Sequence, residues 1–201
     1  MTVRGLLVDF GGVLTTDVFA SFERFCVAEG LPAGSVKERF RTDPAARRLL
    51  AGLEDGTVPD AEFEQQFAAL LGVEPDDLIE RLMGAAGPDA AMQDAVRAAR
   101  RFGIRTGLVS NSWGVGRYDR QLLAELFDGV VISAEVGMRK PAPEIYALGA
   151  QAVGLPPAAC IYVDDIGGNL KPARALGMTT VLHKDTPTTI ASLSALLGVP
   201  L

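Results

Sequence analysis

Five short apolar segments alternate with longer segments of helical spacing, and this alternation restricts the fold more than any other feature of the sequence. Each apolar segment stops at a polar residue, as is typical of buried strands in a parallel sheet. Strands that alternate with helices predict an α/β fold, a Rossmann-like parallel sheet core with helices on both faces. The expected strands are 3–8, 104–109, 129–132, 160–163 and 179–182, and the expected helices are 89–102, 115–127, 143–153 and 168–176.

The segment 17–85, between the first two expected strands, has no strand pattern. Its aromatic residues recur at helical spacing, and Asp60 is the expected N-cap of one helix. The residues at this spacing are Phe19, Phe22, Phe63 and Phe67. We therefore expect a helical cap over residues 17–85, inserted into a core formed by residues 1–16 and 86–201.

Composition and charge exclude several classes of protein. The 201 residues carry a formal net charge of −6, which repels phosphate backbones, so we expect no nucleic-acid partner. No apolar segment reaches the ~18 residues of a membrane helix, and residues 1–8 do not resemble a signal peptide. We therefore expect a soluble, cytoplasmic protein without a membrane partner. Two isolated cysteines and one histidine, His183, do not suit a zinc site. The sequence does not indicate an oligomeric state.

Chemically capable side chains collect at the expected strand ends or, for Lys140, soon after one. They are Asp9, Ser110, Asn111, Lys140, Asp164 and Asp165. The carboxyl ends of parallel strands meet at one edge of the sheet, where open α/β sheets bind ligands. Polar residues at a single strand end are often only turn residues. Their combination at several ends favours a functional site.

The acidic members of this set suit phosphoryl transfer assisted by a metal ion. Asp9 can attack phosphorus and form an aspartyl phosphate. Mg²⁺ prefers oxygen ligands, which Asp9, Asp165 and a backbone carbonyl of the Gly11-Gly12 turn can supply.

The other members suit the phosphate group, whose negative charge must be neutralised. We expect a helix to begin near Ser110, so that the backbone amides of Asn111 and Ser112 bind phosphate oxygens. Lys140 would balance the charges of the carboxylates and the phosphate.

Four motifs resemble those of the haloacid dehalogenase (HAD) superfamily and occur in the same order. They are Val8-Asp9-Phe10-Gly11-Gly12-Val13-Leu14, Leu108-Val109-Ser110-Asn111, Lys140-Pro141-Ala142-Pro143-Glu144-Ile145-Tyr146 and Tyr162-Val163-Asp164-Asp165-Ile166-Gly167-Gly168-Asn169. Ser110-Asn111-Ser112-Trp113 and the stretch from Asp164 to Arg174 are similar to the N-terminal phosphatase domain of soluble epoxide hydrolases. The resemblance implies a HAD-like core with a helical type-one cap, acting as a Mg²⁺-dependent phosphatase on a small phosphorylated metabolite.

The resemblance also implies a role for each site residue. Catalysis would rest on Asp9 as nucleophile, with Ser110 and Lys140. The substrate would contact Gly11, Gly12, Ser110, Asn111 and Lys140. The metal would be held by Asp9, the carbonyl of Gly11, and Asp165 with Asp164 beside it, while Asn169 supports the acid pair.

Gly11 departs from the family pattern, because phosphatases of the family usually carry there a second aspartate that protonates the leaving group. General acid–base catalysis contributes ~10²–10⁴-fold, so its loss matters. Three interpretations stay open: a slower phosphatase with another proton donor, activity on good leaving groups, or a binding or regulatory protein. Asp17 is a possible substitute, although a role in starting the first cap helix is favoured.

A haloacid dehalogenase, which works without metal and with a cap arginine, is the other enzyme interpretation. Arg39 and Arg41 are the cap arginines considered for that role. The adjacent acids Asp164 and Asp165 argue against it, since they need a cation to be tolerated. Trp113 either shapes the mouth of the pocket or packs in the interior.

Overall fold

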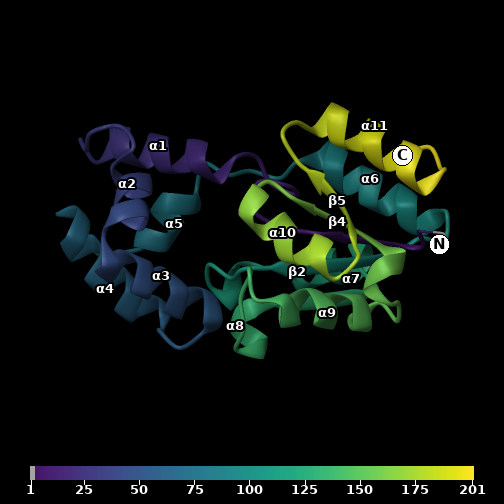
Figure 1. Cartoon of the computed structure of the whole chain (residues 1–201). Coiled ribbons are helices and arrows are strands. Elements are labelled where there is room, and N and C mark those ends of the chain that lie inside the picture. Colours follow the sequence, from purple (N-terminus) through teal and green to yellow (C-terminus); the bar gives the residue numbers. More distant parts are fainter. Residues whose placement is uncertain (1–2) are drawn as a thin grey trace.

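A five-stranded sheet forms the centre of the larger of two lobes in the computed structural model, which describes residues 3–201 (Figure 1). The strand order is β3-β2-β1-β4-β5, and the neighbouring strands are parallel. The expected α/β fold is therefore confirmed. The strands are β1 (Gly5–Val8), β2 (Arg105–Ser110), β3 (Gly129–Ile132), β4 (Cys160–Asp164) and β5 (Thr179–Leu182).

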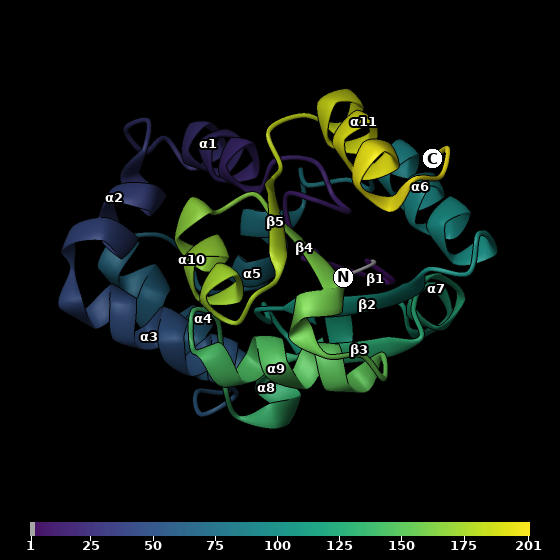
Figure 2. The same ribbon diagram turned by 45° about the vertical axis from the view of Figure 1, so that its right-hand side comes forward.

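Helices cover both faces of this sheet (Figures 1 and 2). Leu6 and Val8 of β1 join the apolar cluster on one face, and Leu7 joins the cluster on the other. Because both faces are buried, the strand is apolar throughout. The helices on the first face are α6 (Ala90–Arg101), α7 (Arg120–Leu126) and α11 (Thr186–Leu197), and those on the second are α9 (Pro143–Ala152) and α10 (Gly167–Ala175).

Five helices form the smaller lobe and enclose an apolar core of their own. They are α1 (Val18–Ala28), α2 (Ser35–Thr42), α3 (Pro44–Asp55), α4 (Asp60–Leu71) and α5 (Leu78–Met83). Phe22, Phe63 and Phe67 lie in this core, as their helical spacing predicts. Trp113 reaches it from the larger lobe, so the two lobes share one aromatic contact region.

The chain crosses between the lobes twice, and the two crossing segments lie side by side. The amide of Thr16 donates to the carbonyl of Gly87 at 2.8 Å, and the amide of Gly87 donates to Thr16 Oγ1 at 3.1 Å. These crossings flank the segment 17–85, which we continue to propose as a cap within a core of residues 1–16 and 86–201. Residues 1–2 of that core lie outside the described residues.

The expected helix 115–127 is wrong, because the chain breaks there into a 3₁₀ helix, η1 (Val115–Arg117), and α7. Gly114 has a φ of 97°, and Tyr118 between the two pieces is extended, with a ψ of 119°. The extended backbone lets the buried Tyr118 ring reach Ser110.

Three further helices and one cap differ from expectation. The helices α8 (Ser133–Val136) and α11 were not foreseen, nor was the 3₁₀ helix η2 (Pro157–Ala159). Asp60 does not cap α4, since Pro59 holds that position and Asp60 is the first helical residue. A carboxylate there still favours the helix, because it lies near the positive end of the helix dipole. Within residues 3–201, no helix combines the length and the apolar character needed to cross a bilayer.

Candidate active site

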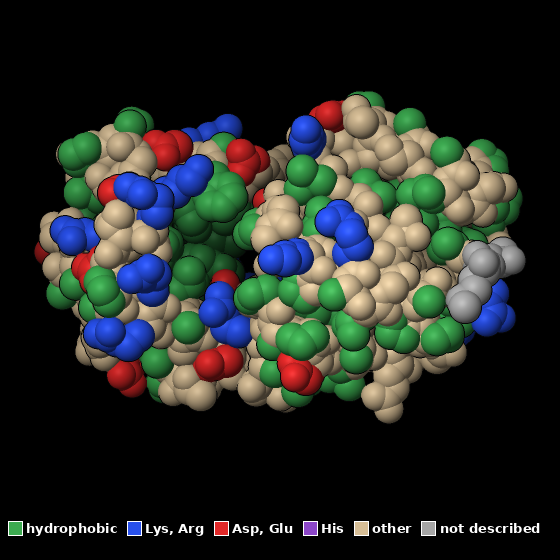
Figure 3. Space-filling model, viewed as in Figure 1, with side chains coloured by type: hydrophobic (Ala, Val, Ile, Leu, Met, Phe, Trp, Pro, Cys, Tyr) green, Lys and Arg blue, Asp and Glu red, His purple; other side chains and the backbone are tan. Residues whose placement is uncertain are grey.

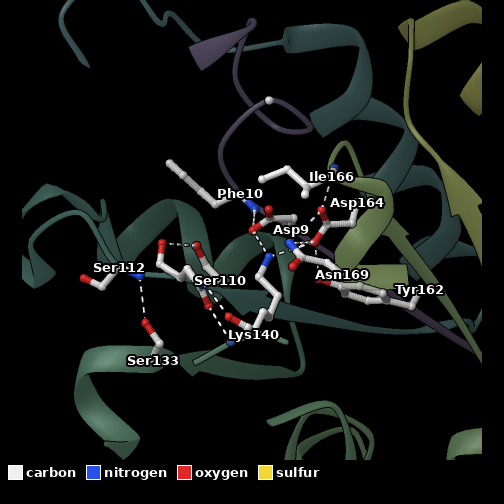
Figure 4. Close-up of polar contacts among 12 residues, drawn as sticks. Asp9, Phe10, Ser110, Ser112, Ser133, Lys140, Tyr162, Asp164, Ile166 and Asn169 are labelled. Carbon is white, nitrogen blue, oxygen red and sulfur yellow. Dashed lines mark hydrogen bonds and ion pairs between the residues drawn. The ribbon is translucent and has the colours of Figure 1, made fainter. Parts of the chain in front are cut away.

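The carboxyl ends of β1 and β4 place two acids around one lysine (Figure 4). Asp9 follows β1 directly, and its amide donates to the carbonyl of Val163 at 2.9 Å, which fixes it beside β4. Lys140 Nζ lies 2.7 Å from Asp9 Oδ1 and 2.9 Å from Asp164 Oδ2. All three side chains are at least 90% buried. The structure thus brings together three residues from distant parts of the sequence.

Asp164 is held by hydrogen bonds on both oxygens. Its Oδ2 accepts from Lys140 Nζ and from the hydroxyl of Tyr162 at 2.5 Å. Its Oδ1 accepts from the amide of Ile166 at 2.8 Å, and the side-chain amide of Asn169 donates to both oxygens at 3.1 Å. This saturation suits a residue that positions Lys140 more than one that binds a metal directly. Tyr162 lies two residues before Asp164 on one strand, so the two side chains point to the same face.

Asp165 completes a cluster of three carboxylates. One oxygen each of Asp9, Asp164 and Asp165 lies within 4.8 Å of the others. Asp165 Oδ1 is buried, and no hydrogen-bond partner for it occurs within residues 3–201. A buried carboxylate oxygen without a partner is costly unless a cation compensates it. An all-oxygen donor set of this kind fits Mg²⁺.

Burial and like charge change the acidity of these groups. Burial, with smaller contributions from Asp164 and Asp165, raises the pKa of Asp9 to about 7, although Lys140 opposes the shift. Burial and neighbouring Asp164 raise the pKa of Asp165 to about 6. Burial alone would lower the pKa of Lys140, but the two adjoining carboxylates outweigh it and raise that pKa. Lys140 therefore stays charged, and the carboxylates gain from any further cation.

The end of β2 contributes Ser110 and Asn111, with contacts that the sequence did not indicate. Ser110 Oγ lies 2.9 Å from the hydroxyl of Tyr118. The Asn111 side chain accepts from the amide of Lys140 at 2.8 Å and donates to Glu54 of α3 at 3.1 Å. Asn111 thus links the lysine loop (137–142, between α8 and α9) to the smaller lobe through its side chain.

The expected helix start after Ser110 is wrong. No α-helix begins there, and η1 starts only at Val115. The amide of Ser112 donates to the hydroxyl of Ser133 at 2.8 Å, so it is engaged inside the protein. A phosphate-binding helix terminus at this point therefore has no support in the geometry.

The two glycines after Asp9 have different surroundings. Gly11 lines the cavity next to Asp9, and its φ is not positive. Gly12 has a φ of 72°, and its amide donates to Thr15 Oγ1 at 3.0 Å. A Cβ at Gly12 would lie 2.4 Å from Asp165 Oδ2. Gly12 is therefore fixed by the turn and by Asp165, and it is not among the residues that line the cavity.

A cavity of about 240 Å³ opens over Asp9 between the two lobes (Figure 3). Asp9, Ser110, Asn111, Lys140 and Asp165 lie along one side. The other side is formed mainly by apolar residues of the smaller lobe and the loop after β2: Val18, Phe19, Phe22, Phe40, Leu50, Met83 and Trp113. Both interpretations of Trp113 hold, because it lines the cavity and also packs against the apolar core of the smaller lobe.

The other residues singled out from the sequence lie outside this cavity. Arg39 pairs with Asp43 at 3.5 Å and Arg41 pairs with Glu38 at 2.7 Å, both at the surface. Asp17 is exposed and caps α1, accepting from the amide of Phe19 at 2.7 Å. His183 Nδ1 lies 3.0 Å from Thr189 Oγ1, which is a structural contact. Lys37, which no sequence signal singled out, is the α2 cation that does line the cavity.

Glu54 is the main site residue that the sequence did not reveal. It is buried at the end of α3, where Arg139 Nε donates to its Oε2 at 2.5 Å. Burial raises the pKa of Glu54, and Arg139 opposes the shift. Its only sequence signal is a carboxylate next to the apolar face of a helix, which is too common to be informative.

Known proteins resemble this chain over most of its length. The profile of the haloacid dehalogenase-like hydrolase family matches residues 3–177. The bifunctional epoxide hydrolase 2 of Sus scrofa is 30% identical over 221 residues, but the chain spans only 40% of that protein. Phosphatase MT3486 of Mycobacterium tuberculosis is 30% identical over 199 residues, covering 90% of this chain and 88% of its own. A predicted HAD-like family hydrolase of Porphyromonas gingivalis has a similar solved structure, with a TM-score of 0.74, 24% identity and 98% of both chains covered.

Proposed function

The chain belongs to the haloacid dehalogenase-like hydrolases, and from this premise we propose that it is a Mg²⁺-dependent phosphatase of small phosphomonoesters. The observation that carries the proposal is the ion pair of Asp9 and Lys140 at the floor of the cavity, next to the acid pair Asp164-Asp165. The name of the relative phosphatase MT3486 supports the proposal, and the similarity to it extends over 90% of this chain. The epoxide hydrolase is matched over less than half its length, so we transfer no epoxide chemistry from it.

The first step is attack by an oxygen of Asp9 on phosphorus. A bond forms between Asp9 and phosphorus, the bond from phosphorus to the alcohol oxygen breaks, and the alcohol leaves with a proton taken from water. Lys140 offsets negative charge as it builds up on the phosphoryl oxygens, and Ser110 donates a hydrogen bond to one of them. Water then attacks the phosphorus of the aspartyl phosphate, which releases inorganic phosphate and restores Asp9.

Asp9 and Asp165 would hold the metal, and Asp164 would keep Lys140 in place. Bound Mg²⁺ would neutralise the crowded carboxylates and polarise a phosphoryl oxygen. The single positive charge of Lys140 does not balance the negative charges of these groups. The buried, unpartnered oxygen of Asp165 is the feature of this chain that fits such an ion, among the residues described.

Gly11 favours a second candidate function, a binding protein of this family without turnover. No carboxyl group stands two residues after Asp9, and Asp17 is engaged at the start of α1. The dehalogenase alternative has less support, because the paired surface residues Arg39 and Arg41 do not line the cavity.

Turnover of p-nitrophenyl phosphate separates these functions, because its leaving group needs no proton donor. We expect phosphate release that depends on Mg²⁺ and stops with a chelator. Asp9→Asn should abolish it, while Asp94→Asn, at an exposed surface pair, should leave it unchanged. Absence of turnover by well-folded, Mg²⁺-loaded wild type would favour the binding protein. Undiminished turnover by Asp9→Asn would refute the covalent route.

A further inference from the structure

We propose that the cavity selects phosphomonoesters whose organic group is apolar, such as alkyl or aryl chains, over phosphates of sugars and polyols. This inference names the substrate class of the phosphatase proposed above and rests on that function. Figure 3 shows the hollow between the lobes lined by hydrophobic side chains.

Aromatic rings make up much of the wall that faces the acids. Trp113 lies 5.5 Å from Phe22 and 5.9 Å from Phe40, measured between ring centroids, and Phe22 lies 6.1 Å from Phe19. These four rings line the cavity together with the aliphatic side chains of the smaller lobe. Apolar ligand surface placed against them leaves water, which favours binding in proportion to the apolar area buried.

Two apolar side chains at this cavity are exposed, and core packing does not account for them. Phe19 is 37% exposed and Ile166 is 45% exposed, and both line the cavity. Phe19 comes from the smaller lobe, whereas Ile166 follows the acid pair of the larger lobe. Apolar residues held open on both sides of a cavity mark a surface that a ligand covers.

Several polar groups of the cavity wall already have partners elsewhere in the protein. Glu54 pairs with Arg139 and Asn111, and Arg117 pairs with Glu80 at 2.5 Å. The hydroxyl groups of a sugar would therefore find few partners along the rings, and each buried group left unsatisfied is unfavourable. Lys37 is the remaining cation of the wall, and its Nζ lies 4.9 Å above the ring of Phe19.

Trp113 ties the apolar wall to the phosphate end of the cavity. It is the third residue after Ser110 and packs into the core of the smaller lobe. A ligand whose phosphate meets Ser110 and Lys140 thus has its organic group directed at the rings. The segment from Ser110 to Trp113 would therefore contact both the phosphate and the apolar group of the substrate.

Binding of straight-chain alkylphosphonates to the Mg²⁺-loaded protein tests the proposal without depending on turnover. Calorimetry would compare methyl-, butyl- and octylphosphonate, below the concentrations at which they self-associate, with hydroxylated phosphonates of equal length. We expect Kd to fall by up to about fourfold for each methylene buried, until the chain fills the cavity. Equal affinity along the series, or tighter binding of the hydroxylated ligands, would overturn the proposal.

Two variants test whether the apolar wall of the cavity causes the dependence of binding on alkyl chain length. Phe19→Ser removes an exposed ring from the cavity wall and should weaken octylphosphonate binding several-fold while leaving methylphosphonate binding unchanged. Phe102→Ser removes a ring that is 52% exposed but lies outside the cavity, and should change neither. Equal losses in both variants would contradict the assignment of the wall.

The outcomes distinguish this inference from the proposed function. Chain-length-dependent binding without turnover of p-nitrophenyl phosphate would leave the apolar site standing and remove the phosphatase. Turnover of p-nitrophenyl phosphate with the same Kd for all alkylphosphonates would support the phosphatase and remove the apolar site.

Discussion

At the scale of single residues, the two glycines after Asp9 carry opposite constraints. Gly11 has ordinary backbone geometry, and a Cβ there would meet only Val18 Cγ2, at 3.2 Å. Gly12 has a positive φ and no room beside Asp165. A side chain is therefore tolerated at the first position after a shift of a few tenths of an ångström, and excluded at the second.

Gly11→Asp should increase kcat/KM for alkyl phosphates more than for p-nitrophenyl phosphate. An alkoxide leaves poorly unless it is protonated, whereas p-nitrophenolate leaves unaided, so a carboxyl group at this position helps the alkyl ester selectively. Because general acid catalysis contributes ~10²–10⁴-fold, we expect the ratio of the two kcat/KM values to change at least about tenfold. The measurement is that ratio at saturating Mg²⁺.

Two matched variants control for the backbone. Gly11→Ala adds the Cβ without the acid and should leave the ratio unchanged. Gly12→Ala forces a Cβ against Asp165 and should weaken the stabilisation by Mg²⁺. If a well-folded Gly11→Asp protein keeps the wild-type ratio, Gly11 does not mark a missing acid.

Which site residues could be predicted depends on how local their signal is. Asp9 and Asp164 stand at strand ends, which parallel strands bring together whatever the loops do. Lys140 lies in the loop between α8 and α9, so its place was indicated by the resemblance to the family motif and not by a strand end. Tyr162 had a usable signal, its spacing of two from Asp164. Glu54 could not be found, because its partner Arg139 is 85 residues away and nothing in either segment specifies the pairing.

At the scale of elements, α3 and the lysine loop form a contact between the two lobes beside the site. Glu54 binds Arg139 and Asn111, and its carbonyl accepts from the Ser133 hydroxyl. Asn111 in turn holds the backbone of Lys140 on both its amide and its carbonyl. Glu54 therefore acts on the site through Asn111.

Glu54→Ala should lower stability by about 1–3 kcal/mol, because it leaves partly buried donors without their acceptor. It should also lower kcat/KM for p-nitrophenyl phosphate, since Asn111 loses one of the bonds that orient it. Glu38→Ala breaks a pair with both side chains more than half exposed, and should leave stability almost unchanged. Chemical denaturation and kinetics compare the two; equal losses would mean that burial of the Glu54 pair is unimportant.

The strands could be predicted because their sequence pattern is local. Buried parallel strands are recognisable because both faces are apolar, and each expected strand lies within two residues of the observed one. The helix expected over 115–127 failed because Gly114 and Gly116 weaken it and the contact of Tyr118 with Ser110 requires extended chain. α11 had local signals, with Asp185 as N-cap and a proline in the first turn, but its polar residues are only threonines and serines, so no charged face marks it as an amphipathic helix.

At the scale of the whole molecule, the crowded carboxylates couple folding to pH and metal. A carboxyl group whose pKa is higher in the folded protein than in the unfolded chain stabilises the fold at low pH, and this contribution is lost as the pH rises through the folded pKa. For Asp9 the window runs from 3.8 to about 7, and for Asp165 from 3.8 to about 6. Removing the protons leaves like charges buried together unless a cation replaces them.

Mg²⁺ should therefore stabilise the protein more at pH 7.5 than at about pH 5, because protons compete with the metal for the same carboxylates. The measurement is the free energy of unfolding with Mg²⁺ and with a chelator at each pH. The lowered pKa of His183, caused by burial, acts in the opposite sense but equally in both conditions. Asp165→Asn should flatten the difference. A Mg²⁺ effect independent of pH would contradict the assignment of these ligands.

Trp113 is the single tryptophan of the chain, and it sits where the lobes and the cavity meet. The chain therefore carries one intrinsic fluorophore at its functional junction, and its emission reports the polarity of that point without any label. Octylphosphonate, by expelling water from around the indole, should shift the emission maximum to shorter wavelength, while inorganic phosphate should leave it nearly unchanged. Stopped-flow mixing would then resolve the rates at which ligands enter and leave the unmodified protein.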